Sequence, residues 1–130
     1  MPILKDTMTD VPQVLIVDDD ADALAVLARP LLHRGYIVTQ TTSSKTALDL
    51  FSRCQFDLVI LDLSMPEPDG LEVLQYVRSK IPQLKIVVIS GFLQGTLLPV
   101  AKLFGAVCGM EKPINSELFI STVEGALNSN

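Results

Sequence analysis

Acidic side chains follow two of the apolar runs in this chain, and their type and spacing suit metal-assisted chemistry. Asp18, Asp19 and Asp20 come directly after the apolar run VLIV at 14–17, and Asp62 ends a second apolar run. Clustered carboxylates repel one another unless a divalent cation neutralises them, and an oxygen-rich site that keeps several waters suits Mg²⁺. We therefore expect Asp18 and Asp19 to hold a magnesium ion close to Asp62.

A hydroxyl and an ammonium group complete a set that could transfer a phosphoryl group. Ser90 ends the run KIVVIS, and Lys112 follows a short β-rich stretch. Phosphoryl transfer needs positive charge around the phosphoryl oxygens more than covalent help from the protein, and Mg²⁺ together with Lys112 would supply it. Asp62 is then the expected nucleophile, Ser90 a donor to a phosphoryl oxygen, and the backbone carbonyl of Ser64 a further metal ligand.

Each of these residue types also has a purely structural explanation. Asp20 and Asp22 are expected to cap a helix and to favour the positive end of its dipole. Ser90 alone would be a strand-end hydroxyl bonded to backbone, and Lys112 alone an ordinary surface lysine. The row of acids, hydroxyl and ammonium at successive strand ends favours the chemical explanation. The single histidine, His33, is expected to be solvated and not to accept a phosphoryl group.

Short β-rich runs alternate with amphipathic stretches along the chain, which is the rhythm of parallel α/β proteins. The expected strands are 13–17, 36–39, 56–61, 85–90 and 106–110. The expected helices are one around 24–31, then 44–53 after the capping candidate Ser43, 70–79, 97–104, and 116–127 after Asn115. The third and fourth strands are nearly all apolar, which indicates burial on both faces.

The first expected helix has a clear apolar stripe and one disturbing residue. The stripe follows helical spacing at Leu24, Leu27, Ala28 and Leu31. Gly35 stands where a helix C-cap would be, and Pro30 predicts a kink or a frayed second half. The segment 65–70, rich in proline and ending in glycine, is expected to be a shaped loop without chemistry of its own.

Five strands, each followed by a helix, predict a mostly parallel sheet covered by helices on both sides and joined by right-handed crossovers. In such sheets ligands bind beyond the carboxyl ends of the strands, where the strand order reverses. With the order 2-1-3-4-5, neighbouring strand ends roughly 4.8 Å apart would set the acids, the Ser90 hydroxyl and the Lys112 ammonium in one row.

Composition limits the classes of function. The chain has 130 residues, 48% of them apolar and only 5% aromatic, which fits one domain with a mainly aliphatic core. Ten Lys and Arg against 15 Asp and Glu give a formal charge of −5 with no basic run, so direct nucleic-acid binding by this segment is not expected. With no secretory signal and no apolar stretch near ~20 residues, neither secretion nor a membrane span is expected, and the cytoplasm is the default location.

The cysteines and the two ends of the chain are expected to be unremarkable in function. Cys54 and Cys108 lie far apart, with no CxxC and no clustered histidines, which argues against a zinc site or a redox pair. Both are expected to be buried or partly buried thiols. Residues 1–11 and 128–130 are expected to be loose, which leaves 12–127 as the domain.

Five ordered motifs resemble the receiver domain of two-component response regulators. These motifs are IVDDD, LDLSMPEPDG, VVISG, LFGA and KPI, and the resemblance covers about residues 12–127. It implies a flavodoxin-like doubly wound (βα)₅ fold. It also implies that a histidine kinase or histidine phosphotransfer protein phosphorylates Asp62, and that a downstream effector or output domain receives the state. A receiver catalyses only its own phosphorylation and dephosphorylation, so an enzyme with an external substrate is not expected.

The resemblance also assigns roles to residues around the phosphorylated aspartate. It implies Mg²⁺ bound by Asp18, Asp19, Asp62 and the Ser64 carbonyl. It further implies a cis peptide bond between Lys112 and Pro113.

The switch region departs from the usual pattern of this family. Receivers commonly carry Tyr or Phe three residues before the lysine, and here that residue is Gly109. Ser90, Gly91 and Phe92 are expected to report phosphorylation to the loop after the fourth strand. Phe92 is also expected to flank the phosphoryl group and to exclude attacking water.

A second departure concerns the surface that would bind a partner. The run 86–101 contains no charged residue. We hypothesise that the face built by 97–104, 106–110 and 116–127 is apolar and docks a partner protein or a second copy in a homodimer. The alternative, that its leucines only fill the core under a loop, remains open.

Three functions of different classes are compatible with these residues. The favoured one is a phosphorylation-switched signalling module. The second is a receiver-shaped docking module that works without phosphorylation, which the glycine at 109 and the apolar face suggest. The third, a Mg²⁺-dependent phosphohydrolase, is disfavoured because the chain shows no cap or substrate-binding segment and no second base near Asp62.

Overall fold

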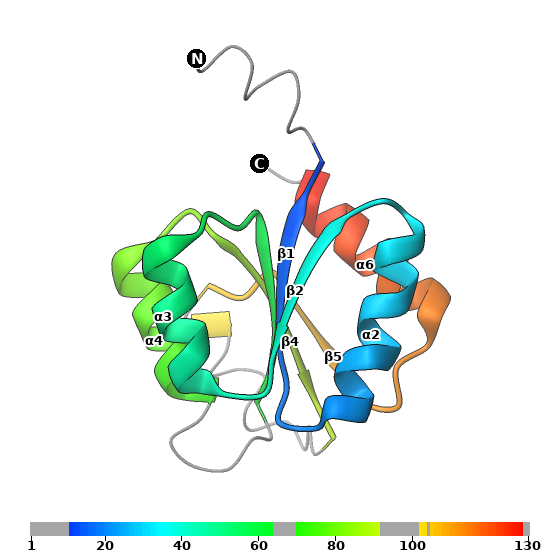
Figure 1. The fold of residues 1–130 in the computed structure, drawn as a ribbon, viewed down its shortest axis with the longest axis horizontal. Helices are drawn as coiled ribbons and strands as arrows, with labels where there is room; N and C mark the ends of the chain where they lie inside the picture. Colours follow the sequence, from blue (N-terminus) through cyan, green and yellow to red (C-terminus); the bar gives the residue numbers. More distant parts are fainter. Residues whose placement is uncertain (1–10, 64–69, 92–101, 104, 129–130) are drawn as a thin grey trace.

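Five parallel strands form one sheet in the order β2-β1-β3-β4-β5, which confirms the predicted order and fold class (Figure 1). The computed structural model describes residues 11–63, 70–91, 102–103 and 105–128. The strands are β1 Gln13–Val17, β2 Ile37–Thr41, β3 Leu58–Asp62, β4 Lys85–Ser90 and β5 Cys108–Glu111. The helices are α2 Ala21–His33, α3 Ser44–Arg53, α4 Gly70–Lys80 and α6 Ser116–Asn128.

Two helix layers bury the sheet on both faces. Helices α2 and α6 cover one face, where Leu27 and Phe119 pack against Ile16 and Ile60 of the central strands. Helices α3 and α4 cover the other face, where a second cluster is centred on Leu15, Val59 and Leu61, with Phe51 of α3 and Leu74 of α4 among its members. Every residue of β3 is buried, as its continuous apolar run predicted.

Local sequence signals set the starts of three helices. The Asp20 carboxylate accepts a hydrogen bond from the backbone N–H of Asp22 at the start of α2. The Ser43 hydroxyl accepts from Thr46 N–H, and the Asn115 side chain accepts from Leu118 N–H. These bonds satisfy backbone donors that have no partner inside the helix, so the predicted caps are confirmed.

Several element bounds differ from the sequence prediction. Strand β1, strand β4 and helix α3 have the predicted bounds, whereas β2, β3 and β5 each lie one or two residues further along than predicted. Register explains the shift, because β3 must align Leu58–Leu61 with β1 and its own last residue, Asp62, with Ile89 of β4. Of the helix predicted at 97–104, the structure describes only residues 102 and 103, and both are helical.

Expectations about two single residues were wrong, one of them only in part. Helix α2 continues through Pro30 to His33, so its second half is not frayed, because Leu31 directly after the proline is fully buried and holds the last turn on the sheet. The kink expected as the alternative at Pro30 stays a prediction. Gly35 follows with a φ of 85°, as expected for a residue that ends a helix. Cys54 is exposed, since it sits at the C-cap of α3 beyond the buried stripe, whereas Cys108 is partly buried.

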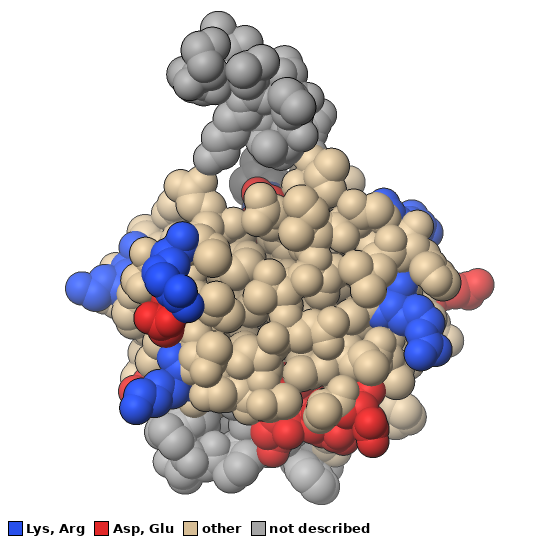
Figure 2. All heavy atoms as spheres, viewed as in Figure 1, with Lys and Arg blue, Asp and Glu red and all other residues tan. Residues whose placement is uncertain are grey.

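The surface has a clear distribution of charge (Figure 2). In that view β2 lies at the centre of the molecule, and the centre of the surface carries no charged side chain. Basic groups lie at both flanks, and acidic groups gather near the start of α2. Among the described residues, no helix has the length and apolar character needed to cross a membrane.

Candidate functional site

The carboxyl ends of β1 and β3 bring the first two acidic groups together. The two strands are neighbours, with Val17 aligned to Leu61, so the residues that follow, Asp18 and Asp62, are side by side. Both side chains are almost fully buried, at 0% and 1% exposed. At this point the chain leaves β1 toward α2 on one face, and the strand order reverses, which is where ligands bind in open parallel sheets.

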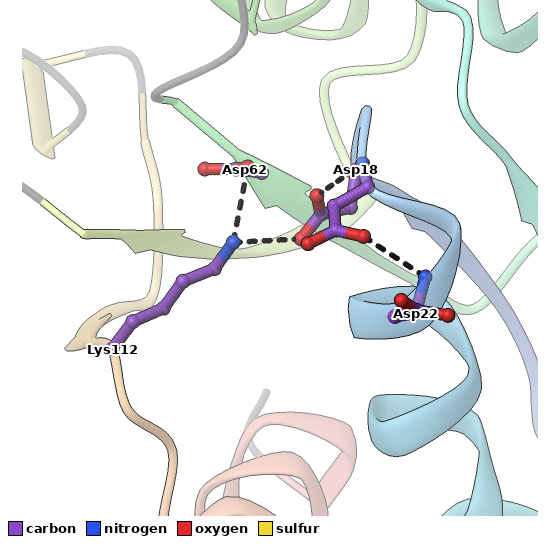
Figure 3. A network of polar contacts seen from close by, with 5 residues as sticks. Asp18, Asp22, Asp62 and Lys112 are labelled. Carbon is purple, nitrogen blue, oxygen red and sulfur yellow. Dashed lines mark hydrogen bonds and ion pairs between the residues drawn. The ribbon is translucent and has the colours of Figure 1, made fainter.

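Backbone contacts hold Asp18 in place. Its N–H donates to the Thr41 carbonyl at the end of β2, at 3.2 Å. Its Oδ1 accepts from the backbone N–H of Asp20, at 3.0 Å. Asp20 is in turn the N-cap of α2, so the same short turn that starts the helix also orients the Asp18 carboxylate (Figure 3).

Lys112 directly follows β5, the outer strand at the other edge of the sheet from β2, and its side chain reaches both buried carboxylates. Its Nζ lies 3.0 Å from Asp18 Oδ2 and 3.3 Å from Asp62 Oδ2. Its backbone N–H donates to the Ser90 carbonyl at 2.9 Å, which ties the end of β5 to the end of β4. The predicted cis peptide bond between Lys112 and Pro113 is present.

Burial and the ion pairs act on the protonation of this group of side chains. Burial is the largest influence on Asp18 and raises the pKa of its carboxyl, and the hydrogen bonds from Asp20 and Lys112 offset only part of that rise. Burial alone would lower the pKa of the Lys112 ammonium, but its contacts with Asp18 and Asp62 outweigh burial and raise that pKa. The lysine is therefore held firmly in its charged form between two acids.

Three carboxylates are placed to share a cation. Asp18, Asp19 and Asp62 each offer an oxygen, and these oxygens all lie within 4.8 Å of one another. Asp19 is exposed whereas the other two are buried, so the group opens to solvent on one side. Hard oxygen ligands with an open, hydrated side are the donor set that Mg²⁺ prefers. The residues present therefore fit a magnesium ion. Ser64, the fourth expected ligand, lies outside the described residues.

The remaining predicted residues are distributed as follows. Ser90 is the last residue of β4, is fully buried, and lies next to β3 in the sheet. Gly91 follows it and is partly buried, while Phe92 lies outside the described residues. Gly109 sits within β5, aligned with Val88. His33 is exposed at the end of α2, as expected.

The sequence places Gly70 at the end of a shaped loop and the start of a helix but predicts no relation to the site. Gly70 is buried at the start of α4 against the end of β3. A Cβ atom there would lie 2.9 Å from the Asp62 backbone oxygen and 3.2 Å from Leu63 Cα. The sequence did carry a signal for this close approach. The glycine stands at the start of an amphipathic stretch, and a residue without a Cβ lets a helix start close to a strand.

Comparison with known proteins places this geometry in a family. Residues 14–124 match the family model for the response regulator receiver domain. The chain is 34% identical over 119 residues to the DNA-binding transcriptional regulator NtrC of Azospirillum brasilense, covering 90% of this chain but 24% of that protein. It is 29% identical over 115 residues to the response regulator receiver protein CpdR of Brucella abortus, covering 88% of this chain and 96% of that protein.

Solved structures agree with the sequence comparison. The receiver domain of NtrX from Brucella abortus superimposes with a TM-score of 0.81 at 29% identity, over 90% of this chain and 99% of that one. A CheY-like receiver domain protein from Methanospirillum hungatei JF-1 gives a TM-score of 0.85 at 25% identity, over 92% and 95% of the two chains. The chain spans about a quarter of the length of NtrC, the first of these relatives. With the family model matching most of its length, this chain belongs to the response regulator receiver domains.

Proposed function

We propose that this domain is a phosphorylation-switched receiver in which Asp62 accepts a phosphoryl group from a histidine kinase or a histidine phosphotransfer protein. The observation that carries the proposal is the contact of one partly buried lysine with two buried carboxylates at the carboxyl edge of the sheet. Burying acidic groups is costly unless a charge compensates them, and such arrangements mark functional sites.

The transfer step would be a displacement at phosphorus. A carboxylate oxygen of Asp62 forms a bond to the phosphorus of a phosphohistidine, the N–P bond breaks, and its electron pair stays on the departing imidazole nitrogen. Lys112 would hold positive charge at a phosphoryl oxygen, and the Ser90 hydroxyl would donate to another. Mg²⁺ held by Asp18, Asp19 and Asp62 would neutralise the remaining negative charge. Later attack of water on phosphorus returns the Asp62 carboxylate and free phosphate.

The phosphorylated state would be read at the face that includes β5 and the start of α6. Three large apolar side chains there are exposed: Leu103 at 84%, Leu118 at 58% and Val107 at 41%. The Lys112 backbone connects the end of β5 to the Ser90 carbonyl, so a shift of Ser90 toward a phosphoryl oxygen would move this face. A downstream effector or output domain is its proposed partner.

A second function is favoured by one departure from the family pattern. Gly109 stands where receivers commonly carry an aromatic residue, so the usual aromatic signal to this face is missing. The exposed leucines could therefore dock a partner without phosphorylation. Binding of the partner with equal affinity to wild type and to Asp62→Asn, with and without phosphodonor, would favour this second function.

Intact mass after incubation with a small phosphodonor and Mg²⁺ tests the proposal. One added phosphoryl group is expected in wild type, and none in Asp62→Asn or in the presence of EDTA. Asp22→Asn is a matched control, because Asp22 lies in the same acidic stretch but outside the three metal-binding candidates. Asp22→Asn is expected to be phosphorylated like wild type, and phosphorylation of Asp62→Asn would contradict the assignment of the acceptor.

A further inference from the structure

Strand β2 is an outer strand of the sheet, and in the described part of the chain it pairs only with β1. Its sequence, IVTQT, carries no charge, and Ile37 is 50% exposed. Proteins usually protect an outer strand with a lysine, a proline, a bulge or a covering loop, because its free backbone groups can pair with another chain. Figure 2 shows that the surface over β2 is the uncharged centre of this face. Strand β2 is thus open to another strand.

The direction of the backbone groups in β2 limits how a further strand could pair. Ile37 N–H donates to the Pro12 carbonyl, and the Thr41 carbonyl accepts from Asp18 N–H, so these residues direct their backbone groups toward β1. The direction alternates along a strand. Val38 and Gln40 therefore direct their N–H and C=O groups away from the sheet.

We propose that a second copy of this chain pairs its β2 antiparallel to this one, with a two-fold axis at Thr39. In that register Val38 lies opposite Gln40 of the second copy, and the two residues exchange both of their backbone hydrogen bonds. The symmetric pair of Gln40 and Val38 does the same. The sheet then continues through both copies, and because the same patch serves both, the assembly closes as a dimer and does not grow into a fibre.

Charge along helix α2 selects the antiparallel arrangement. A groove of about 260 Å³ runs between α2 and β2, and its lining includes Ala25, Arg29, Leu32 and Gln40. Helix α2 has Asp22 in its first turn and Arg29 near its end. In the antiparallel dimer the acidic start of one α2 lies beside the basic end of the other. Ala25 and Leu32, the latter 52% exposed, lie between these charges and would lose contact with water.

A parallel partner would instead carry its α2 on the opposite face of the continued sheet, so Asp22 and Arg29 of the two copies could not pair. The antiparallel pair also places the two acidic sites at opposite ends of the dimer, since Asp18 and Asp62 lie at the carboxyl edge of each sheet. Neither site is covered. The proposed pairing is therefore independent of phosphorylation and of the effector face at β5 and α6.

Sedimentation velocity on the full chain over a wide concentration range tests the dimer. Wild type is expected to associate as concentration rises, and Ile37→Lys to weaken association at least about tenfold. Leu118→Lys is the matched control, because Leu118 is similarly exposed, at 58%, but belongs to α6 on a different face. A wild type that stays monomeric into the millimolar range would overturn the proposal. So would a dimer that Leu118→Lys abolishes and Ile37→Lys retains.

Cysteine cross-linking tests the register. In a Cys54→Ser, Cys108→Ser background, Thr39→Cys places two thiols at the two-fold axis. A directly opposed pair without hydrogen bonds has Cα atoms about 4.5 Å apart, which is within disulfide range. Under mild oxidation Thr39→Cys is expected to form a covalent dimer, and Gln40→Cys, offset from the axis, to form far less. Equal cross-linking of both variants, or a dimer in which neither cross-links, would show that the register is wrong.

Discussion

Replacing Gly70 by alanine is expected to disturb the phosphorylation site through the backbone of Asp62. The added Cβ would lie 2.9 Å from the Asp62 carbonyl oxygen and 3.0 Å from Leu63 Cδ2. The leucine methyl can rotate away, but the carbonyl belongs to the buried end of β3, so helix α4 or the strand must move. Ordinary contact begins at 3.4 Å, which requires a displacement of about 0.5 Å.

The size of the effect follows from that displacement. Overpacking of a buried position costs typically ~1–3 kcal/mol of unfolding free energy. A misplacement of about 1 Å at a reacting group can cost about 100-fold in rate, so half of that distance is expected to slow phosphorylation by about tenfold. Gly125→Ala is the matched control, because Gly125 lies inside α6 with no atom within 4 Å of a Cβ there. Gly125→Ala is expected to raise the unfolding free energy by ~0.5–1 kcal/mol and to be phosphorylated at the wild-type rate.

Two assays separate the two effects. Urea unfolding of both variants gives the change in unfolding free energy, and intact mass over time with a small phosphodonor gives the rate of phosphorylation. The rates are compared at a temperature where Gly70→Ala remains folded by circular dichroism. If Gly70→Ala loses stability but phosphorylates as fast as Gly125→Ala, the close approach supports the fold alone. If it loses neither, the contact with Asp62 has been misjudged.

Three further predictions concern the acidic group and its lysine. Burial raises the pKa of Asp18 above its ordinary value of 3.8, so the folded state binds this proton more tightly than the unfolded state, and the associated stability is lost as pH rises through the folded pKa. Without Mg²⁺, Asp18→Asn is therefore expected to become more stable relative to wild type as pH rises from 3 to 7, and a constant difference in urea unfolding would contradict this. Mg²⁺ at about 100 times its Kd is expected to raise the unfolding free energy of wild type by ~2.7 kcal/mol, and EDTA is expected to reverse this gain. In the same titration Asp18→Asn is expected to gain much less. Lys112→Met is expected to slow phosphorylation by a small phosphodonor at least about tenfold, since it removes the cation that lies 3.3 Å from Asp62, and a wild-type rate by intact mass would remove the lysine from the mechanism.

Features set by near neighbours could be predicted from the sequence. The caps at Asp20, Ser43 and Asn115 were predicted correctly, because each side chain bonds a backbone N–H two or three residues away. The strand order was predicted correctly as well, since parallel strands with single helical crossovers permit few arrangements. In this way the sequence placed Asp18 and Asp62 at one edge of the sheet.

Contacts between distant residues needed the tertiary structure. Lys112 was expected beside a phosphoryl group, but only the folded chain shows its ammonium between Asp18 and Asp62, 94 and 50 positions away. The close approach of Gly70 to Asp62 depends on how α4 lies against β3.

The same division applies to the surface and to the ends of the strands. The sequence alone determined which stretches become strands and helices, because β-rich apolar runs and helical spacing are local properties. Where β2, β3 and β5 begin and end was decided by register with their neighbours. The exposure of Cys54 and the open edge of β2 were decided by packing, since a residue becomes buried or exposed only through elements that are distant in the chain.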